Sequence, residues 1–228
     1  MRRFLANGSS TSPKKTTPRL LFHTCQAKAV RKALHENEVL DDYRVEPEEL
    51  LEGIRFVRCK IRSARWLDAK LVRCDFEECD LSGIHLSSAS LTSCSFLNCN
   101  FTDADLYGAS FENCRMVGSQ FAGALLSGIK VSSGDWSFVQ MRMQELDGLD
   151  FSGVKFEGTD FYGASLVKAS LNGAILKDAN LQHAKLQEAD LRGADLSGVQ
   201  LKNVELRGAR MNIEQALLFA ICHGIVIE

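Results

Sequence analysis

The sequence predicts an all-β solenoid, an elongated coil of short repeated sides, on three observations. Every fifth residue from Phe56 to Met211 is a large apolar side chain, at 32 consecutive positions. Small residues, mostly alanine and cysteine, stand two positions before these large residues. Like residues also recur every 20 positions, as Phe56, Phe76 and Phe96 do. A fixed period of this kind is typical of a repeat architecture.

The five-residue period matches neither the two-residue alternation of a strand nor the 3.6-residue turn of a helix. Its phase does not slip, which leaves no room for an inserted helix or long loop. We therefore expect a large and a small residue of each side to point inward, with polar residues outside and glycine at tight corners. Four such sides complete one coil, which accounts for the longer recurrence. Residues 52–211 then predict roughly eight coils, a rod on the order of 38 Å long at about 4.8 Å per coil.

The repeat also carries a recognisable motif. Residues 104–108 read ADLYG and residues 189–193 read ADLRG, and both match the pattern A(D/N)LXX. In this motif the chain resembles the pentapeptide-repeat family. The resemblance implies a right-handed quadrilateral β-helix, and it does not by itself imply a function.

Residues 1–53 differ in composition from the repeat. Residues 1–19 hold five Lys/Arg, six Ser/Thr and no acid. They predict a disordered tail, with an organellar transit peptide as the alternative. Residues 20–53 predict a helical extension and cap. One helix is expected from Thr24 to about Asn37, and a short one at residues 46–51, which begins beside a proline and precedes a glycine.

The β-helix is expected to span residues 54–211, and residues 212–228 to form a C-terminal cap. Asn212 and Gln215 have the spacing of a capping box, and the apolar run 213–222 predicts a helix. Gly224 is expected to end this helix and residues 225–227 to form a final strand. Because a helix this apolar must be covered on more than one side, Leu217, Leu218 and Ile221 predict the interface of a two-fold homodimer.

Eight cysteines stand in the chain, and six of them occupy inward small-residue positions. We expect these six to be reduced, buried and structural, with disulfides or a metal site as alternatives. The six are Cys59, Cys74, Cys79, Cys94, Cys99 and Cys114.

No apolar run approaches the length of a membrane span, so no membrane association is expected. A cytoplasmic location follows, or an organellar one if residues 1–19 are a transit peptide.

Charge is distributed unevenly along the chain. Residues 55–73 carry a net charge of +6, and residues 75–161 carry −9. The basic segment predicts a solvated face, or a contact for acidic partners or nucleic acid. The acidic segment predicts a partner-binding surface that includes Asp103, Asp105, Asp147 and Asp150, and a continuous acidic stripe would imitate duplex DNA. The alternative is that aspartate merely suits the turns of the repeat.

One stretch in the middle of the repeat departs from the pattern of small inward residues. There these positions read Ile129, Gly134, Val139, Gln144 and Leu149. We expect the rod to swell or bulge there, through local repacking of the core or as a partner site. A buried Gln144 would need hydrogen-bond partners.

No catalytic constellation is visible in the sequence. The five histidines are scattered, and no phosphate-binding glycine loop is present. A narrow, filled rod also offers no cavity for chemistry. We therefore expect no enzyme activity and no catalytic, cofactor-binding or metal-ligating residues, and instead a protein that acts through protein–protein contacts.

The end of the chain suggests one class of partner. Residues 215–218 and 224–227 resemble the C-terminal dimerisation helix and tail of the quinolone-resistance group of the family. That group binds DNA gyrase in place of DNA, so the resemblance implies a DNA mimic whose partner is gyrase or another topoisomerase, without direct nucleic-acid binding. No register-breaking loop projects from the repeat, unlike in the best-known members. The alternative is a generic interaction scaffold, such as a bacterial effector or an organellar repeat protein, which residues 1–50 fit better.

Overall fold

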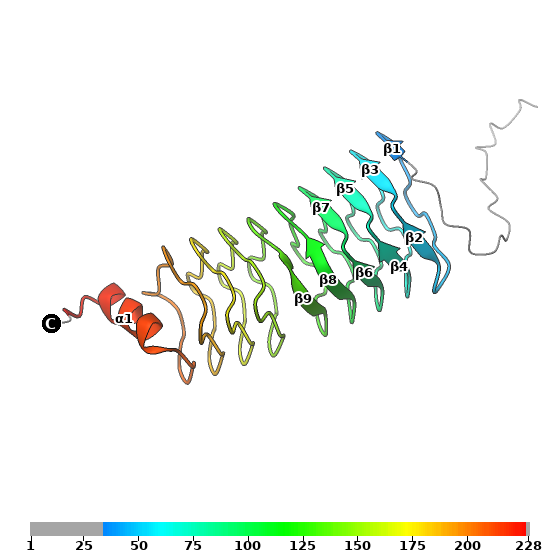
Figure 1. Cartoon of the computed structure of the whole chain (residues 1–228). Helices are drawn as coiled ribbons and strands as arrows, with labels where there is room; N and C mark the ends of the chain where they lie inside the picture. The colour runs from blue at the N-terminus through cyan, green and yellow to red at the C-terminus, as the bar shows by residue number, and fades with distance from the viewer. Residues whose placement is uncertain (1–33, 227–228) are drawn as a thin grey trace, which may run out of the picture.

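Short parallel strands stack side by side along a rod that ends in one helix (Figure 1). The structure is a computed structural model and describes residues 34–226. Its elements are β1 (Leu34–Glu36), β2 (Leu50–Glu52), β3 (Arg55–Val57), β4 (Lys70–Val72), β5 (Asp75–Glu77), β6 (Ser90–Thr92), β7 (Ser95–Leu97), β8 (Ser110–Arg115), β9 (Lys130–Asp135) and α1 (Ile213–Cys222). The predicted solenoid is confirmed.

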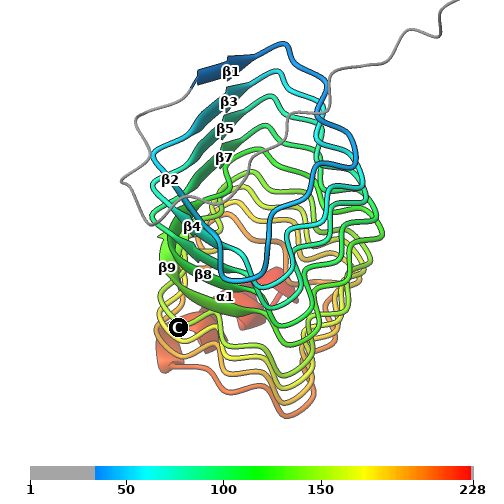
Figure 2. The ribbon, with the colours of Figure 1, turned by 90° about the vertical axis from the view of Figure 1, so that its right-hand side faces the viewer.

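From residue 50 onward, the pairing register advances by 20 positions from one coil to the next; the pairs of residues 34–44 are offset by 21. Leu51 pairs with Leu71, and Phe56 with Phe76, in parallel ladders. Isolated bridges at the same offset continue to the pair Asp190 and Arg210. The named strands occupy about five turns. This count differs from the eight coils predicted because isolated single-residue bridges, and not strands, join the later turns. Viewed obliquely along the rod, the coils lie behind one another (Figure 2).

The core is the five-residue series itself. Of its 32 members, 29 are buried, and Val131, Leu206 and Met211 are half-buried. Stacking at the offset of one coil places like rings face to face: Phe76 lies 4.8 Å from Phe56 and 4.6 Å from Phe96 between ring centroids. The inward register predicted from the sequence is therefore confirmed along the rod.

The predicted N-terminal helices are not formed where the structure describes the chain. Residues 34–36 and 50–52 are strands, and Pro47 lies in a turn between them. Val45 and Leu51 are buried like other inward residues, so the solenoid already includes residues 34–53, ahead of the predicted start at residue 54. Pairing with the next coil satisfies these backbones, whereas a six-residue helix would leave most of its polar groups open. The predicted tail and residues 24–33 of the predicted helix lie outside the described residues.

The C-terminal helix forms where the sequence predicts it. The amide of Asn212 donates to Oε1 of Gln215 at 2.6 Å, as a capping box requires. The helix ends at His223, and Gly224 follows with a φ of 77°. Residues 225 and 226 form no strand, so that prediction is wrong for the part the structure describes. Between residues 34 and 226, no helix is long and apolar enough to cross a membrane.

Candidate protein-binding surfaces

The cysteines at inward positions are part of the scaffold. All six are buried and unpaired. The thiol of Cys79 donates to the main-chain oxygen of Phe56 at 3.4 Å, and Ser119 makes the same contact to Phe96 at 3.0 Å. Burial raises the pKa of the Cys99 thiol well above its ordinary value. Because all six thiols are buried and shielded from reagents, this ladder serves packing.

The basic segment 55–73 is matched by acids in the coils beside it. Arg58 pairs with Glu36 at 2.5 Å, and Arg55 pairs with Glu77 at 2.8 Å. Arg62 pairs with Asp41, and its side-chain hydrogen bonds hold the pKa of that carboxyl below its ordinary value. The sequence separates these charges by roughly the length of one coil, but the winding of the chain places them next to each other. The segment is therefore largely a neutralised face.

Three of the four acids proposed from the sequence lie on one side of the rod. Asp105 is bridged to Leu125, and Glu145 stands one coil further along that side. Asp103 and Asp147 flank this column. We call Asp103, Asp105, Glu145 and Asp147 the acidic face. The sequence prediction missed Glu145, although its position two full coils after Asp105 would have pointed to it.

Asp150 belongs to a different side. Its partner in the next coil is Ser170, one side further round than the pair of Glu145 and Ser165. The amide and hydroxyl of Ser152 donate to Asp150 at 3.0 and 2.5 Å, and these bonds lower the pKa of its carboxyl. Asp150 therefore acts as a turn residue, and the structure does not bring it together with the other three.

The acidic face keeps its negative charge. Within residues 34–226, no Lys or Arg forms an ion pair with any of its four carboxylates. Asp105 accepts from the amide of Tyr107 at 3.1 Å and lies 3.8 Å from Nδ1 of His85. Asp147 accepts from Ser165 at 2.5 Å and from the amide of Val167 at 2.9 Å. These contacts orient two of the carboxylates.

An apolar diagonal crosses the acidic face. Tyr107, Leu125 and Met143 are 57%, 48% and 70% exposed. Each stands 18 positions from the next, and this offset brings outward side chains into contact elsewhere on the rod, as between Arg142 and Asp160 at 2.9 Å. Apolar groups rimmed by charge mark interaction surfaces, and Tyr and Met are enriched in them.

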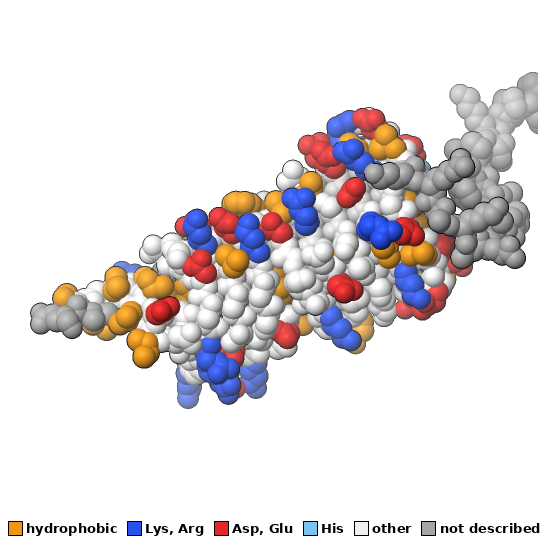
Figure 3. Space-filling view, viewed as in Figure 1, with side chains coloured by type: hydrophobic (Ala, Val, Ile, Leu, Met, Phe, Trp, Pro, Cys, Tyr) orange, Lys and Arg blue, Asp and Glu red, His pale blue; other side chains and the backbone are white. Residues whose placement is uncertain are grey.

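The outer side of α1 is a second exposed apolar surface. On the inner side, Gln215 is buried and donates to the main-chain oxygen of Ala194 at 2.9 Å, and Phe219 packs on the core. Leu217, Leu218 and Ile221, the residues predicted as a dimer interface, are 40%, 38% and 60% exposed. Apolar side chains gather at this end of the rod in the space-filling view (Figure 3).

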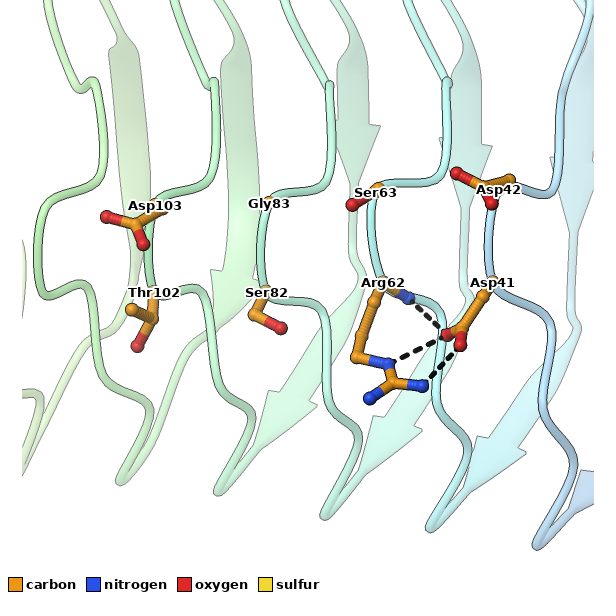
Figure 4. A pocket seen from close by; sticks show the side chains of 8 residues that line it. All are labelled: Asp41, Asp42, Arg62, Ser63, Ser82, Gly83, Thr102 and Asp103. Atoms are coloured by element: carbon orange, nitrogen blue, oxygen red, sulfur yellow. Dashed lines mark hydrogen bonds and ion pairs between the residues drawn. The ribbon is translucent and has the colours of Figure 1, made fainter.

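A shallow groove of about 440 Å³ runs along one corner of the first four coils. Its lining is polar, and the ion pair of Asp41 and Arg62 occupies part of it (Figure 4). Asp42 and Asp103 stand at opposite ends of the row. Among residues 34–226, no group of three His, Cys, Asp or Glu side chains is arranged to hold a metal ion.

Comparison with known families agrees with this architecture. A model described as pentapeptide repeats matches residues 69–106 and 174–212 in eight copies, and a model described as a pentapeptide repeat region matches residues 88–166. The chain belongs to the pentapeptide-repeat family. No curated protein sequence matches it.

Solved pentapeptide-repeat structures share the fold. The structure of a trypsin-treated variant of QnrB1, a plasmid-mediated fluoroquinolone resistance protein, superposes with a TM-score of 0.76 at 20% identity. The match covers 86% of this chain and 98% of QnrB1. HetL, a pentapeptide-repeat protein involved in heterocyst differentiation regulation in Nostoc sp. strain PCC 7120, superposes with a TM-score of 0.63 at 24% identity, over 79% of this chain and 92% of HetL. At these identities the likeness extends to the fold alone.

Proposed function

We propose that this pentapeptide-repeat protein is a non-enzymatic binding protein whose acidic face docks a basic surface of a protein partner. The observation that carries the proposal is the acidic face itself. Four carboxylates without Lys or Arg partners surround the exposed diagonal of Tyr107, Leu125 and Met143. Charge of one sign steers and selects a partner of the other sign, and the apolar centre can supply the buried contacts that stabilise a complex.

The chemistry of the partner follows from the same surface. The diagonal is rimmed by acids at both of its ends, so a matching partner has apolar side chains flanked by Lys or Arg. A basic amphipathic helix satisfies this requirement, because its apolar residues form one stripe between charged flanks. Nucleic acid does not, because phosphates would be repelled by the carboxylates.

DNA gyrase is a second candidate partner. Its support is the extended match of the rod to QnrB1 and the apolar outer side of α1, which would join two copies into a two-fold dimer suited to a two-fold enzyme. The charge pattern supports gyrase less well than it supports a basic amphipathic helix. Outside the acidic face, acids alternate with bases, as in the chain of ion pairs through Asp135, Lys155, Glu157 and Lys177. An acidic stripe along the whole rod is not present on the residues described.

The primary proposal is tested by titrating the protein with a synthetic helical peptide of Lys and Leu. A variant with Asp103→Asn, Asp105→Asn, Glu145→Gln and Asp147→Asn should bind at least about tenfold more weakly, and the wild-type affinity should fall with salt. The control carries Glu77→Gln, Glu157→Gln, Glu188→Gln and Glu205→Gln, which change the net charge by the same amount on other parts of the rod. Equal losses in both variants would show nonspecific attraction and refute a localised site.

Gyrase is tested separately in a supercoiling assay with and without a quinolone. If micromolar protein neither inhibits supercoiling nor protects the enzyme from the drug, gyrase is excluded and the docking proposal stands on the peptide data.

A further inference from the structure

The backbone ladder is interrupted in the middle of the rod. Among the described residues, no backbone hydrogen bond joins residues 122–133 to residues 141–153, which face each other in successive coils. The ladder is intact on both neighbouring coils: Asp105 is bridged to Leu125, and Glu145 to Ser165. We call this interruption the seam.

The other two sides of the same coil pair remain bonded. The amide of Phe121 donates to the oxygen of Gln140 at 3.1 Å, and the amide of Lys155 donates to the oxygen of Gly134 at 3.2 Å. The two coils are therefore attached along two sides of the square and free along the other two. The two bonded sides meet at one corner of the square, so the coils are held together there and are parted at the opposite corner.

The cause lies in the inward residues. Ile129 and Leu149 are buried and stand at a position where the coils before and after have Ala109 and Ala169. Cores are close-packed, so added methyl groups must displace their surroundings. Two bulky residues at neighbouring levels of one column hold the coils apart at that corner. The swelling predicted from the sequence thus takes the form of a parted ladder.

The acidic face straddles the seam. Asp103, Asp105 and Leu125 lie on one lip, and Glu145 and Asp147 lie on the other. We infer that the rod is jointed at the seam, and that a partner docked on the acidic face grips both lips and fixes the joint. This inference rests on the proposed function for its partner, while the joint itself rests on the broken ladder alone.

Amide hydrogen exchange of the free protein tests the joint. The amides of Leu126 and Glu145 face the seam without a backbone acceptor, whereas Leu106 donates to Leu125 at 3.0 Å and Ser165 donates to Gln144 at 2.9 Å. We expect Leu126 and Glu145 to exchange at least about 100-fold faster than Leu106 and Ser165. Similar protection at all four amides would overturn the joint, whether or not the Lys–Leu peptide binds.

Coupling to the partner is tested with the same peptide and a disulfide clamp. Ser132→Cys with Ser152→Cys joins the lips on the side next to the acidic face, and Ser90→Cys with Ser110→Cys is the matched control in an intact ladder. Saturating peptide should slow exchange at Leu126 and Glu145 at least about tenfold. The oxidised seam clamp should change peptide affinity at least about threefold relative to its reduced form, and the control should not. If the peptide binds but does not slow exchange, and the clamp does not change the peptide affinity, the coupling is refuted. The proposed docking site is not affected by that result.

Discussion

The side-chain amide of Gln144 donates a 2.6 Å hydrogen bond to the main-chain oxygen of Phe121, across the coil pair whose ladder is parted. Gln144 is buried, and this bond satisfies its amide nitrogen. The same position holds alanine in Ala104 and Ala164, where backbone bonds do the corresponding work. A long polar side chain thus replaces part of the contact that the seam has lost.

Replacing Gln144 by methionine keeps the volume of the side chain and removes the donor. The Phe121 oxygen then keeps only the amide of Ala124 as a donor, at 3.0 Å, and the lost bond should cost about 0.5–1.5 kcal/mol of unfolding free energy. Denaturant unfolding measures the loss, and Val139→Met in the same coil is a control for added flexibility without a lost donor. An unchanged midpoint for Gln144→Met would mean that the bond contributes nothing.

Gly134 is a position where the backbone requires glycine. Its φ is 121°, and an added Cβ would lie 2.3 Å from the main-chain oxygen of Cys114. Gly134→Ala should therefore destabilise the fold by roughly 2–4 kcal/mol, through backbone strain and a clash with a rigid neighbour. Gly148→Ala is the control: its φ is 68°, but an added Cβ meets nothing within 4 Å, so about 1 kcal/mol is expected. Equal losses in thermal or denaturant unfolding would refute the clash.

The outer side of α1 predicts a dimer. Leu218→Asp with Ile221→Asp should give a monomer in light scattering, because an isologous interface would bury two charges from each copy. The helix itself should persist, since the inward residues Gln215 and Phe219 are untouched. Glu214→Lys, on the same helix, tests whether any charge change suffices. A wild-type protein that is monomeric at micromolar concentration would contradict the interface.

Thiol labelling distinguishes the buried ladder from the C-terminal cysteine. Cys222 is half-buried, while the six ladder cysteines are buried. Because reaction needs an accessible thiolate, Cys222 should be modified first among the cysteines of residues 34–226, and the ladder only on global unfolding. Mass spectrometry of the native and denatured protein follows both. Rapid native modification of Cys79 or Cys99 would contradict the packing described here.

Asp190 provides a prediction for acid pH. The side-chain hydrogen bond from Arg192 lowers its pKa to about 2, from an ordinary value of 3.8. Since the folded-state pKa is depressed, this contact stabilises the fold above about pH 4, and its contribution is lost as the pH falls through about 2. Arg192→Ala should return the pKa toward 3.8 in an NMR titration, whereas Lys202→Ala should leave it unchanged. A pKa near 2 in Arg192→Ala would assign the shift to another group.

The sequence was sufficient for the architecture because one signal repeats at every level of the rod. Residues such as Phe101 and Leu166 report the same inward position, so single irregularities could not disturb the register. The first coil could not be read in this way. It holds His35 at an inward position, and pairs Arg44 with Arg65 at an offset of 21 but Leu50 with Lys70 at 20, so its phase breaks near Pro47. The local pattern of residues 46–51 is typical of a helix. The strand partners that decide the actual structure lie a whole coil away in the sequence.

The surfaces were harder to predict, because charge runs in the sequence do not remain runs in space. The basic segment is neutralised by acids such as Glu36 in the neighbouring coils, and Asp150 faces a different side from Asp147. Glu145 joins the acidic face only once the side of each residue is assigned. The outward residues of α1 could be predicted because a helix at the end of the rod packs on the last coil with one side only. It has more apolar residues than that side can bury.

The constant length of the coil also limits how the gene can lengthen or shorten. Removing or duplicating one whole coil changes the height of the rod by one level and leaves every later side chain facing its former direction. A change of a single five-residue side keeps the core equally well filled, yet it rotates everything downstream by a quarter turn. One side lost between Leu125 and Glu145 would thus leave a well-packed rod whose two halves present their carboxylates to different directions. Binding could be erased by such a deletion without a single contact residue having changed.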